Sequence, residues 1–301
     1  MLFWSVIRDN IVPIFLAIGA GFLAGKVLKV EMTSLSRITF YVFAPCLAFD
    51  SLTRTRLEAS EVGLVTLIAV LAMLINGALA WVLSRALKLD RSTTAAFVLV
   101  IMFVNSGNYG LSLVELAFGE EALARAMIYF VAASTMIYSV GVFVASSGKA
   151  SLKEALGQLV RIPALYAVVA ALLVMWLDIP VPGPIATPIA QLGRASIPAM
   201  LVVLGIQMAY VRHLERLPLV GVASVFRLVV GAAVILGLVT LFNVSGPARQ
   251  ALIIEASTPT AVLTAILAVE YKLEPAFVTG TIVVSTLLSP LTLAALVMLV
   301  Q

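Results

Sequence analysis

Charged residues, histidine and cysteine are all scarce in this sequence, and each shortage narrows what the protein can be. Asp, Glu, Lys and Arg make up only 11% of the 301 residues, whereas an ordinary soluble domain carries about 25%. The one cysteine, Cys46, cannot form an intramolecular disulfide or a cysteine-based metal cluster, and its apolar neighbours indicate a packing role.

The shortage of histidine argues against enzyme chemistry. The one histidine, His213, lies in the basic segment "YVRHLER" with no second ligand nearby, so we expect no metal site. The sequence also lacks the H-E-x-x-H and G-x-S-x-G motifs and any phosphate-binding glycine loop. We therefore predict no catalytic residues, no cofactor and no enzyme activity.

Hydrophobic residues, by contrast, make up 62% of the chain, and the mean hydropathy is +1.14. This composition indicates an integral membrane protein with little material left for a soluble domain. Lys and Arg outnumber Asp and Glu by 19 to 15. Because the basic residues sit in short connections between apolar runs, they orient the chain in a lipid bilayer rather than bind nucleic acid.

Apolar runs long enough to cross a membrane, at roughly 20 residues each, recur ten times, which predicts an all-α polytopic membrane protein. The start, "MLFWSVIRDNIVPIFLAIGAGFLAGK", is long enough to be an uncleaved first helix rather than a secretory signal. The predicted spans cover residues 10–28, 34–53, 62–84, 92–118, 122–146, 162–178, 185–209, 218–242, 247–271 and 275–300.

The distribution of basic residues predicts the orientation of these spans, because cytoplasmic connections carry an excess of Lys and Arg. With both termini extracytoplasmic, the 148–160 connection is cytoplasmic. The inside connections then hold Lys26, Lys29, Arg37, Arg85, Lys88, Arg91, Lys149, Lys153, Arg161, Arg212, Arg216 and Lys272. The outside keeps chiefly Arg8, Arg54, Arg56, Arg125 and Arg249. We expect this membrane to be the cytoplasmic (inner) membrane of a bacterium.

The two halves of the chain, residues 1–150 and 151–301, resemble each other weakly. "FVNSGNYGL" in the fourth span falls at the same place as "EASTPTAVL" in the ninth, and "LSRITFYVFAP" in the second matches "LGRASIP" in the seventh. Five spans per half is an odd number, so the halves have opposite orientations. Inverted repeats of this kind are a recurring design of secondary transporters.

The fourth and ninth spans contain polar interruptions that predict broken helices. In "NSGNYG", Gly107 and Gly110 permit unusual backbone dihedrals, and Asn108 can cap a following helix. In "STPT", Thr258 can serve as N-cap and Pro259 suits the first helical position. We expect two half-helices to begin near the bilayer midplane, at about Asn108 and Thr258, where their N-termini attract an anion.

The residues at these two breaks are the predicted substrate-binding set, although polar groups there can also satisfy freed backbone, and small hydroxyl residues can simply pack helices closely. The set is Asn105, Ser106, Gly107, Asn108, Ser257, Thr258, Pro259 and Thr260. Four further residues are candidates for lining the cavity, namely Pro45, Pro198, Asn76 and Gln207. Hydrogen bonding between helices explains the last two equally well.

Charged residues inside spans are candidates for coupling. Glu255, two residues before the ninth-span break, is the first candidate for a protonatable group, because desolvation favours its neutral form. Glu115 is the second candidate. Arg227, inside "VGVASVFRLVVGAAV", could bind an anionic substrate, pair with either glutamate, or extend to the cytoplasmic headgroups.

The stretches "NSGNYGLSLVELAFG" and "EASTPTAVLTAILAVEYKLEPAFVTGTIVVSTLLSPLT" resemble signatures of the prokaryotic auxin efflux carrier family. That family is related to the plant PIN-formed auxin transporters and, more distantly, to bile-acid sodium symporters. The resemblance implies ten helices in two inverted repeats, with the fourth and ninth broken and crossing. It also implies scaffold helices 1, 2, 6 and 7 and transport helices 3–5 and 8–10 that move like an elevator.

Known substrates of the family are organic anions, among them auxin-like acids, malate and malonate. This sequence departs from the plant pattern at the first crossing, where Asn105, Ser106, Gly107 and Asn108 stand in place of Asn-Pro-Asn. Pro259 matches the proline of the second crossing.

The resulting expectation is a secondary carrier for a small organic anion, working by efflux or linked to protons, and possessing a homodimer interface on its scaffold helices. Two alternatives stay open. One is a sodium-coupled symporter of the bile-acid type, for which the sequence offers few carboxylates beyond Glu255 and Glu270. The other is a non-transporting membrane sensor on the same fold.

Overall fold

The computed structural model describes residues 2–30, 32–146, 162–211 and 214–301, and these ranges fold into helices. The first part of the chain forms α1 (Leu2–Val6), η1 (Ile7–Ile11), α2 (Val12–Val27), α3 (Met32–Ile38), η2 (Thr39–Phe43), α4 (Ala44–Thr53), α5 (Ala59–Ala86), α6 (Arg91–Met102), η3 (Ser106–Gly110), α7 (Leu111–Met136), η4 (Ile137–Gly141) and α8 (Val142–Ala145). The second part forms α10 (Pro163–Trp176), α11 (Gly183–Ala209), α12 (Leu217–Val225), η5 (Phe226–Val230), α13 (Gly231–Leu241), α14 (Gly246–Ser257), α15 (Leu263–Glu270) and α16 (Pro275–Val300). The η segments are single π-helical turns, most of which continue into a neighbouring α-helix.

Six continuous helices in the described ranges are long and apolar enough to cross a membrane. They are Phe3–Val27, Ala59–Ala86, Ser106–Ala145, Gly183–Ala209, Leu217–Leu241 and Pro275–Val300. Shorter or broken helices occupy the other predicted spans, such as α10 with 14 residues, so the count of ten stays a prediction. The 148–160 connection and His213 lie outside the described residues.

Ser106–Ala145 has 40 residues, about twice what one crossing needs. It is interrupted at Gly119, where φ is 78° and ψ is −165°, a backbone conformation that glycine adopts readily. The interruption falls between the predicted spans 92–118 and 122–146, so α7 contains a bend between two differently directed helical parts.

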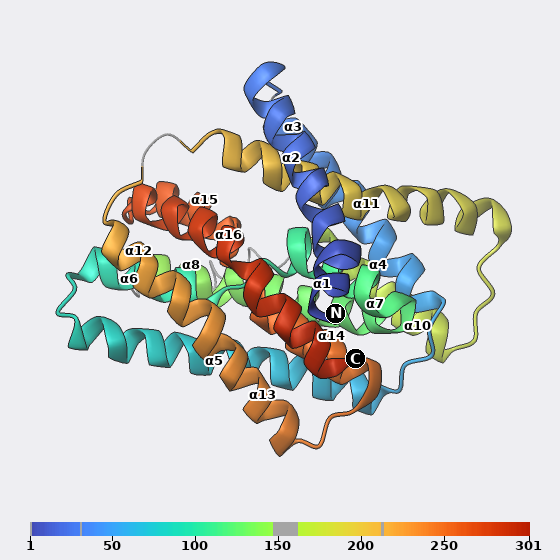
Figure 1. Cartoon of the computed structure of the whole chain (residues 1–301). Helices are drawn as coiled ribbons and strands as arrows, with labels where there is room; N and C mark the ends of the chain where they lie inside the picture. The colour runs from blue at the N-terminus through green and yellow to red at the C-terminus, as the bar shows by residue number, and fades with distance from the viewer. Residues whose placement is uncertain (1, 31, 147–161, 212–213) are drawn as a thin grey trace.

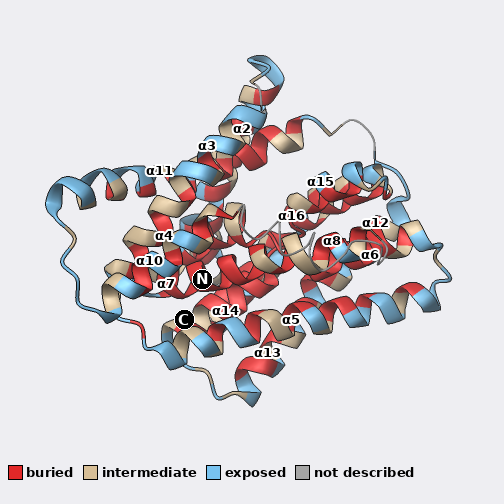
Figure 2. Cartoon of the chain, turned by 180° about the vertical axis from the view of Figure 1, so that it is seen from behind, coloured by how far each residue is buried: buried red, intermediate tan, exposed pale blue. Residues whose placement is uncertain are grey.

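Large apolar side chains cover the outside of the molecule. Exposed examples lie on α2, α5, α10 and α16, among them Leu23, Trp81, Leu173 and Leu291. Buried residues instead concentrate along α6, α7 and α14 in the interior (Figure 2). An apolar surface around a closely packed core is suited to lipid rather than water, which agrees with a multi-pass membrane protein.

The helices pack into two groups. The α11 group consists of α2, α3, η2, α4, α10 and α11, and the α7 group consists of α5, α6, η3, α7, α12, α13, α14, α15 and α16, with the break residues that join them. Figure 1 shows α2, α4 and α11 on one side of the molecule, with α5, α6, α12 and α13 on the other. Inside the α11 group, α2 and α11 approach so closely that a Cβ atom at Gly21 would collide with the backbone of Val202.

Candidate functional site

The two predicted helix breaks meet in the middle of the structure. After α6 ends at Met102, Phe103 adopts an extended conformation, and α14 ends in the same way at Ser257. The Asn105 N–H donates to the Pro259 carbonyl at 2.8 Å, and the Ala261 N–H donates to the Phe103 carbonyl at 3.0 Å. The two extended stretches thus satisfy each other's backbone through a short antiparallel bridge, as burial requires.

The helices resume at different residues from those predicted. The first resumes at Ser106 with Asn105 as its N-cap, so Asn108 lies inside η3 rather than capping it. The second resumes at Leu263, not at Thr258. Thr258 is extended, and its hydroxyl donates backwards to the Glu255 carbonyl at 2.8 Å. The Pro259 carbonyl accepts from the Asn105 N–H rather than from a following helical turn.

A cavity of about 330 Å³ lies where both helices resume, between the α7 group and the α11 group. The first break contributes Asn105, Ser106, Gly107 and Asn108 to its wall. The start of α15 contributes Val262 and Leu263, and the α11 group contributes Ser36, Thr39, Phe40, Met200 and Gln207. Of the predicted cavity-lining residues, Gln207 alone is part of this wall.

Buried polar atoms without a protein partner gather in this cavity. Asn105 is only 4% exposed, yet its Nδ2 has no hydrogen-bond acceptor among the described residues. Ser36 Oγ, Thr39 Oγ1 and Gln207 Oε1 are also buried and have no hydrogen-bond partner among the described residues. Because buried polar groups are normally hydrogen-bonded, this cluster indicates a site for a polar ligand.

The start of η3 adds backbone donors to the same wall. The first hydrogen bonds of this turn run from the N–H groups of Tyr109 and Gly110 to the Asn105 carbonyl, at 3.3 and 3.0 Å. The N–H groups of Ser106, Gly107 and Asn108 precede them, so they carry the partial positive charge of a helix N-terminus. This helix start therefore favours an anion in the cavity.

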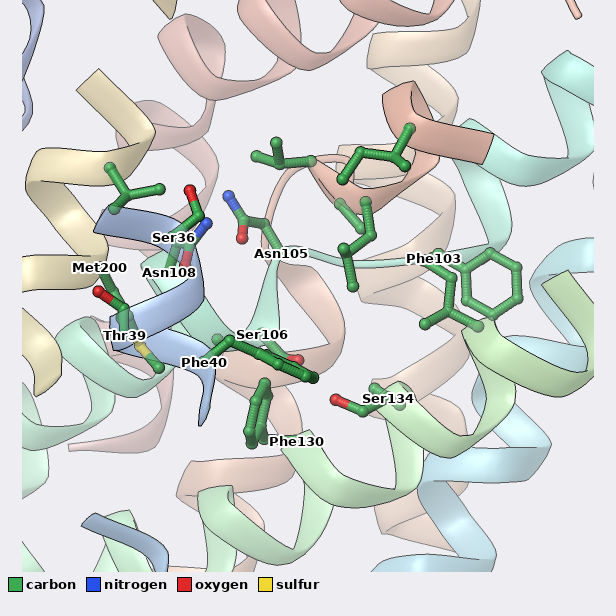
Figure 3. Close-up of a pocket in the computed structure, with 18 of the residues that line it drawn as sticks. Ser36, Thr39, Phe40, Phe103, Asn105, Ser106, Asn108, Phe130, Ser134 and Met200 are labelled. Atoms are coloured by element: carbon green, nitrogen blue, oxygen red, sulfur yellow. The ribbon is translucent and has the colours of Figure 1, made fainter. Parts of the chain in front are cut away.

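Aromatic rings line another part of the cavity. Figure 3 shows the amides of Asn105 and Asn108 on one side, and the rings of Phe40 and Phe130 together near Ser134. Tyr138 extends this apolar part, with its ring centroid 6.3 Å from that of Phe40. The sequence did not single out these aromatics, because nothing in their local pattern separates them from ordinary packing residues.

The predicted residues of the second break lie behind the cavity rather than in its wall. Ser257, Thr258 and Thr260 are fully buried. Thr260 donates its hydroxyl to the Val100 carbonyl at 2.8 Å and its N–H to Ser285 Oγ at 3.2 Å. Thr258, Pro259 and Thr260 therefore hold the crossing together.

Glu255 is also fully buried and does not line the cavity. Neither carboxylate oxygen has a hydrogen-bond partner among the residues that the structure describes. The carboxyl group packs against Gly110, where a Cβ atom would collide with it. Glu255 therefore lies against η3 at Gly110 and outside the cavity wall, whereas Asn105 and Asn108 line the cavity.

The structure places Arg227 away from the headgroups, the cavity wall and both glutamates. It is fully buried and so does not extend to the headgroups, it does not line the cavity, and no carboxylate in the described ranges forms an ion pair with it. Its Nη1 donates to the Ile101 carbonyl at 2.7 Å, and its Nη2 donates to the Ala256 carbonyl. The guanidinium thus joins the ends of α6 and α14.

Glu115 lies in a second cavity, of about 250 Å³, near the opposite ends of α4 and α11. Asp50, Arg54, Glu120 and Arg194 line the same cavity, and Arg54 Nε contacts Asp50 Oδ1 at 2.9 Å. Glu115 and Glu255 therefore belong to two separate parts of the molecule.

Pro45, Pro198 and Asn76 do not line the larger cavity. Pro45 lies in the first turn of α4, and Pro198 is exposed on α11. Asn76 donates its Nδ2 to the Ala72 carbonyl of its own helix at 2.8 Å. Within the described residues, no three His, Cys, Asp or Glu side chains gather as metal ligands would.

Comparison with known proteins identifies the family. A family model described as membrane transport protein matches residues 6–297. An uncharacterized transporter of Methanothermobacter thermautotrophicus is 27% identical over 89% of this chain and 91% of its own length. Another, from Methanocaldococcus jannaschii, is 26% identical over 89% of this chain and 90% of its own length.

These matches cover both helix breaks and the cavity, and they extend over nearly the whole chain. The chain therefore belongs to the membrane transport protein family, that of the auxin efflux carriers which its two break signatures resemble.

Proposed function

We propose that this protein is a secondary carrier that moves a small organic anion through the cavity beside the crossing. The observation that carries the proposal is the Asn105 amide. It is almost fully buried, lines the cavity, and has no acceptor for its Nδ2 among the described residues. With the N–H groups at the start of η3, it forms a donor set that suits a carboxylate.

The aromatic part of the cavity indicates the rest of the substrate. Phe40, Phe130 and Tyr138 suit the apolar body of an auxin-like monocarboxylate whose carboxylate lies at Asn105. A dicarboxylate of the malate or malonate type needs a second cationic contact, and Arg37, an exposed residue of the same cavity, provides one. The variant Arg37→Ala distinguishes the two substrate classes, because it should weaken the binding of a dicarboxylate and leave the binding of a monocarboxylate unchanged.

The packing of the helices supports an elevator-like movement. The break residues belong to the α7 group, which corresponds to the predicted transport helices, and the opposite wall belongs to the α11 group, which corresponds to the predicted scaffold. A shift of one group past the other would carry the cavity across the membrane. We propose that ten spans in two inverted repeats make this shift possible, and that a homodimer forms through the scaffold.

The exposed residues Thr33 and Arg37 place the cavity mouth near the start of α3. In the predicted orientation this end faces the cytoplasm, and on that basis we propose that the cavity opens inward in an inner-membrane carrier. Expelling an anion from a negative interior is downhill by about 2.3 kcal/mol per charge per 100 mV, which favours efflux.

A proton-linked mechanism would use Glu255, which lies against η3 at Gly110. Transport measurements on Glu255→Gln in proteoliposomes distinguish proton-linked transport from efflux that membrane potential alone drives. If transport is linked to protons, a pH gradient drives substrate into vesicles of the parent and not of the variant. If membrane potential alone drives efflux, the variant that folds like the parent retains its flux.

The proposal is tested by a screen of organic acids, including an indole acetic acid, malate and malonate, against purified protein at two pH values. An acid that binds raises the melting temperature of the parent. Asn105→Ala and Asn108→Ala should weaken binding by about 10- to 100-fold, the value of a hydrogen bond to a charged group. Asn76→Ala is the matched control, because Asn76 is a buried amide outside the cavity, and it should bind like the parent.

If Asn105→Ala and Asn108→Ala both bind the acid like the parent, the site assignment fails. Flux that requires sodium would favour the bile-acid type of symporter. Binding without flux under any imposed gradient would favour a sensor. If no acid stabilises the protein at millimolar concentration, the organic-anion proposal is wrong.

A further inference from the structure

The crossing has a second side, where α6 and α14 end, and Arg227 fills it. Arg227 comes from η5, a π-helical turn between α12 and α13. It is the largest fully buried side chain among the described residues. Its Nη1 and Nη2 each donate to one carbonyl from a broken helix, those of Ile101 and Ala256, while its Nε has no acceptor among the described residues. The two helix ends therefore share one cation.

These carbonyls need a partner because the chain breaks directly after them. In a continuous α-helix, the Ile101 carbonyl would accept from residue 105 and the Ala256 carbonyl from residue 260. The N–H of Asn105 instead donates to Pro259, and the N–H of Thr260 donates to Ser285. Arg227 replaces both missing donors.

The charge also balances. Each helix C-terminus carries roughly half a negative charge, so two converging ends attract about one positive charge. In carriers with discontinuous helices, carbonyls at such C-terminal ends coordinate sodium or a proton. We propose that Arg227 is an internal cation at this position, so that the protein holds its crossing together without binding a metal cation there.

The surroundings of Arg227 fit a permanent planar group. Gly231 lies one turn further along the same helix, and a Cβ atom there would collide with the guanidinium. A planar fork can donate to two separated carbonyls, whereas a lysine ammonium is a compact point charge. This role makes Arg227 a positioning residue for the crossing, and it does not depend on the identity of the substrate.

The test is chemical rescue of Arg227→Ala in detergent, read out as melting temperature without any substrate. We expect the variant to melt several degrees below the parent. Millimolar guanidinium should restore part of the loss with saturating dependence, and sodium should stabilise the variant more than choline does. The parent should respond equally to sodium and choline. Leu228→Ala, which truncates a neighbouring buried side chain, should melt lower but gain nothing from guanidinium.

Three results would overturn the proposal. The first is Arg227→Ala melting like the parent, and the second is equal rescue of Leu228→Ala by guanidinium. The third is a parent protein that sodium stabilises more than choline does. If Arg227→Ala yields no folded protein, Arg227→Lys carries the test. Because it keeps the cation but loses the planar fork, it should fold and melt below the parent, whereas Arg227→Met should melt lower still or fail to fold. An Arg227→Met variant as stable as Arg227→Lys would contradict the proposal. These measurements leave the organic-anion proposal standing or falling on its own ligand screen.

Discussion

The two sides of the helix crossing are built in opposite ways. On the side where α6 and α14 end, the carbonyls of Val100, Ile101 and Ala256 accept from side chains, and Arg227 provides two of the three donors. Unpartnered polar atoms among the described residues of this side are Arg227 Nε, Ser257 Oγ and the two Glu255 carboxylate oxygens, none of which lines the cavity. On the side where the helices resume, Asn105, Ser36, Thr39 and Gln207 keep polar atoms without a partner among the described residues. On the first side the protein itself supplies donors to the helix-end carbonyls, whereas on the second side the unpartnered atoms face a cavity that a ligand can enter.

This difference shows that two similar sequence interruptions need not share one role. Both breaks interrupt buried helices, yet the first carries its polar side chains into the cavity and the second directs them into the crossing. Substitutions on the side where the helices end should therefore cost stability, whereas substitutions on the side where they resume should cost ligand binding.

The largest expected effect comes from removing Arg227. Arg227→Ala leaves two buried carbonyls without a donor, at about 1–3 kcal/mol each, so we expect a loss of about 2–6 kcal/mol in the free energy of unfolding. Asn105→Ala removes a side-chain donor that has no protein acceptor in the described ranges, so its stability should stay within about 1 kcal/mol of the parent. Unfolding in detergent and urea measures both. Equal losses would remove the distinction between the two sides.

The next effect concerns the contact between the two breaks. Gly110→Ala places a Cβ atom against the buried Glu255 carboxyl, and overpacking of this kind costs about 1–3 kcal/mol. Glu255→Ala vacates the space, so Gly110→Ala should cost much less in that background. A double-mutant cycle measured by unfolding gives this coupling. Additive effects would mean that the two residues do not press on each other.

A smaller effect should separate two hydroxyl residues of the second break. Thr260→Val removes the donor to the Val100 carbonyl and should cost about 1–2 kcal/mol. Ser257→Ala removes a hydroxyl that has no partner in the part of the chain that the structure describes, so it should be nearly neutral. Melting temperatures of the two variants test this order, and a costlier Ser257→Ala would contradict the described hydrogen bonds.

The smallest effect distinguishes the outer ends of the two broken helices. Asp90 caps α6 by accepting from the Thr93 N–H at 3.1 Å, whereas Ser245 makes no side-chain cap on α14. Asp90→Ala should cost about 1 kcal/mol, and Ser245→Ala should cost almost nothing.

The hydroxyl and then the N–H of Thr93 lower the pKa of the Asp90 carboxyl. A lowered pKa stabilises the folded state above the unfolded-state value of about 3.9. The Asp90→Ala penalty should therefore be complete at neutral pH and shrink as the pH falls below about 4. A penalty that does not change over this range would exclude the charged cap.

The sequence was sufficient to predict the helical membrane class, the family and the positions of both breaks, because composition and local interruptions determine them. It also placed Asn105, Ser106, Gly107 and Asn108 at the wall of one cavity. The predicted start of the second half-helix, Thr258, was wrong, because the helix resumes at Leu263. The hydrogen bond from the Asn105 N–H to the Pro259 carbonyl keeps the intervening residues out of a helix despite the capping preference of Thr258.

The role of Arg227 could not be predicted, because it depends on two carbonyls that are distant in the sequence. The Ala256 carbonyl is 29 residues away and the Ile101 carbonyl is 126 residues away. The place of Phe40 and Phe130 in the cavity wall could not be predicted for the same reason. Local sequence patterns report the structure of a segment, whereas these residues acquire their neighbours only through packing between the two helix groups.

The most direct test of the side where the helices resume is the initial rate of flux of the acid found in the screen, measured in proteoliposomes that contain the parent, Asn105→Ala or Asn76→Ala. We predict that Asn105→Ala raises the half-saturating concentration by about 10- to 100-fold while its melting temperature stays that of the parent, and that Asn76→Ala matches the parent in half-saturation. Unchanged half-saturation in Asn105→Ala would contradict the account.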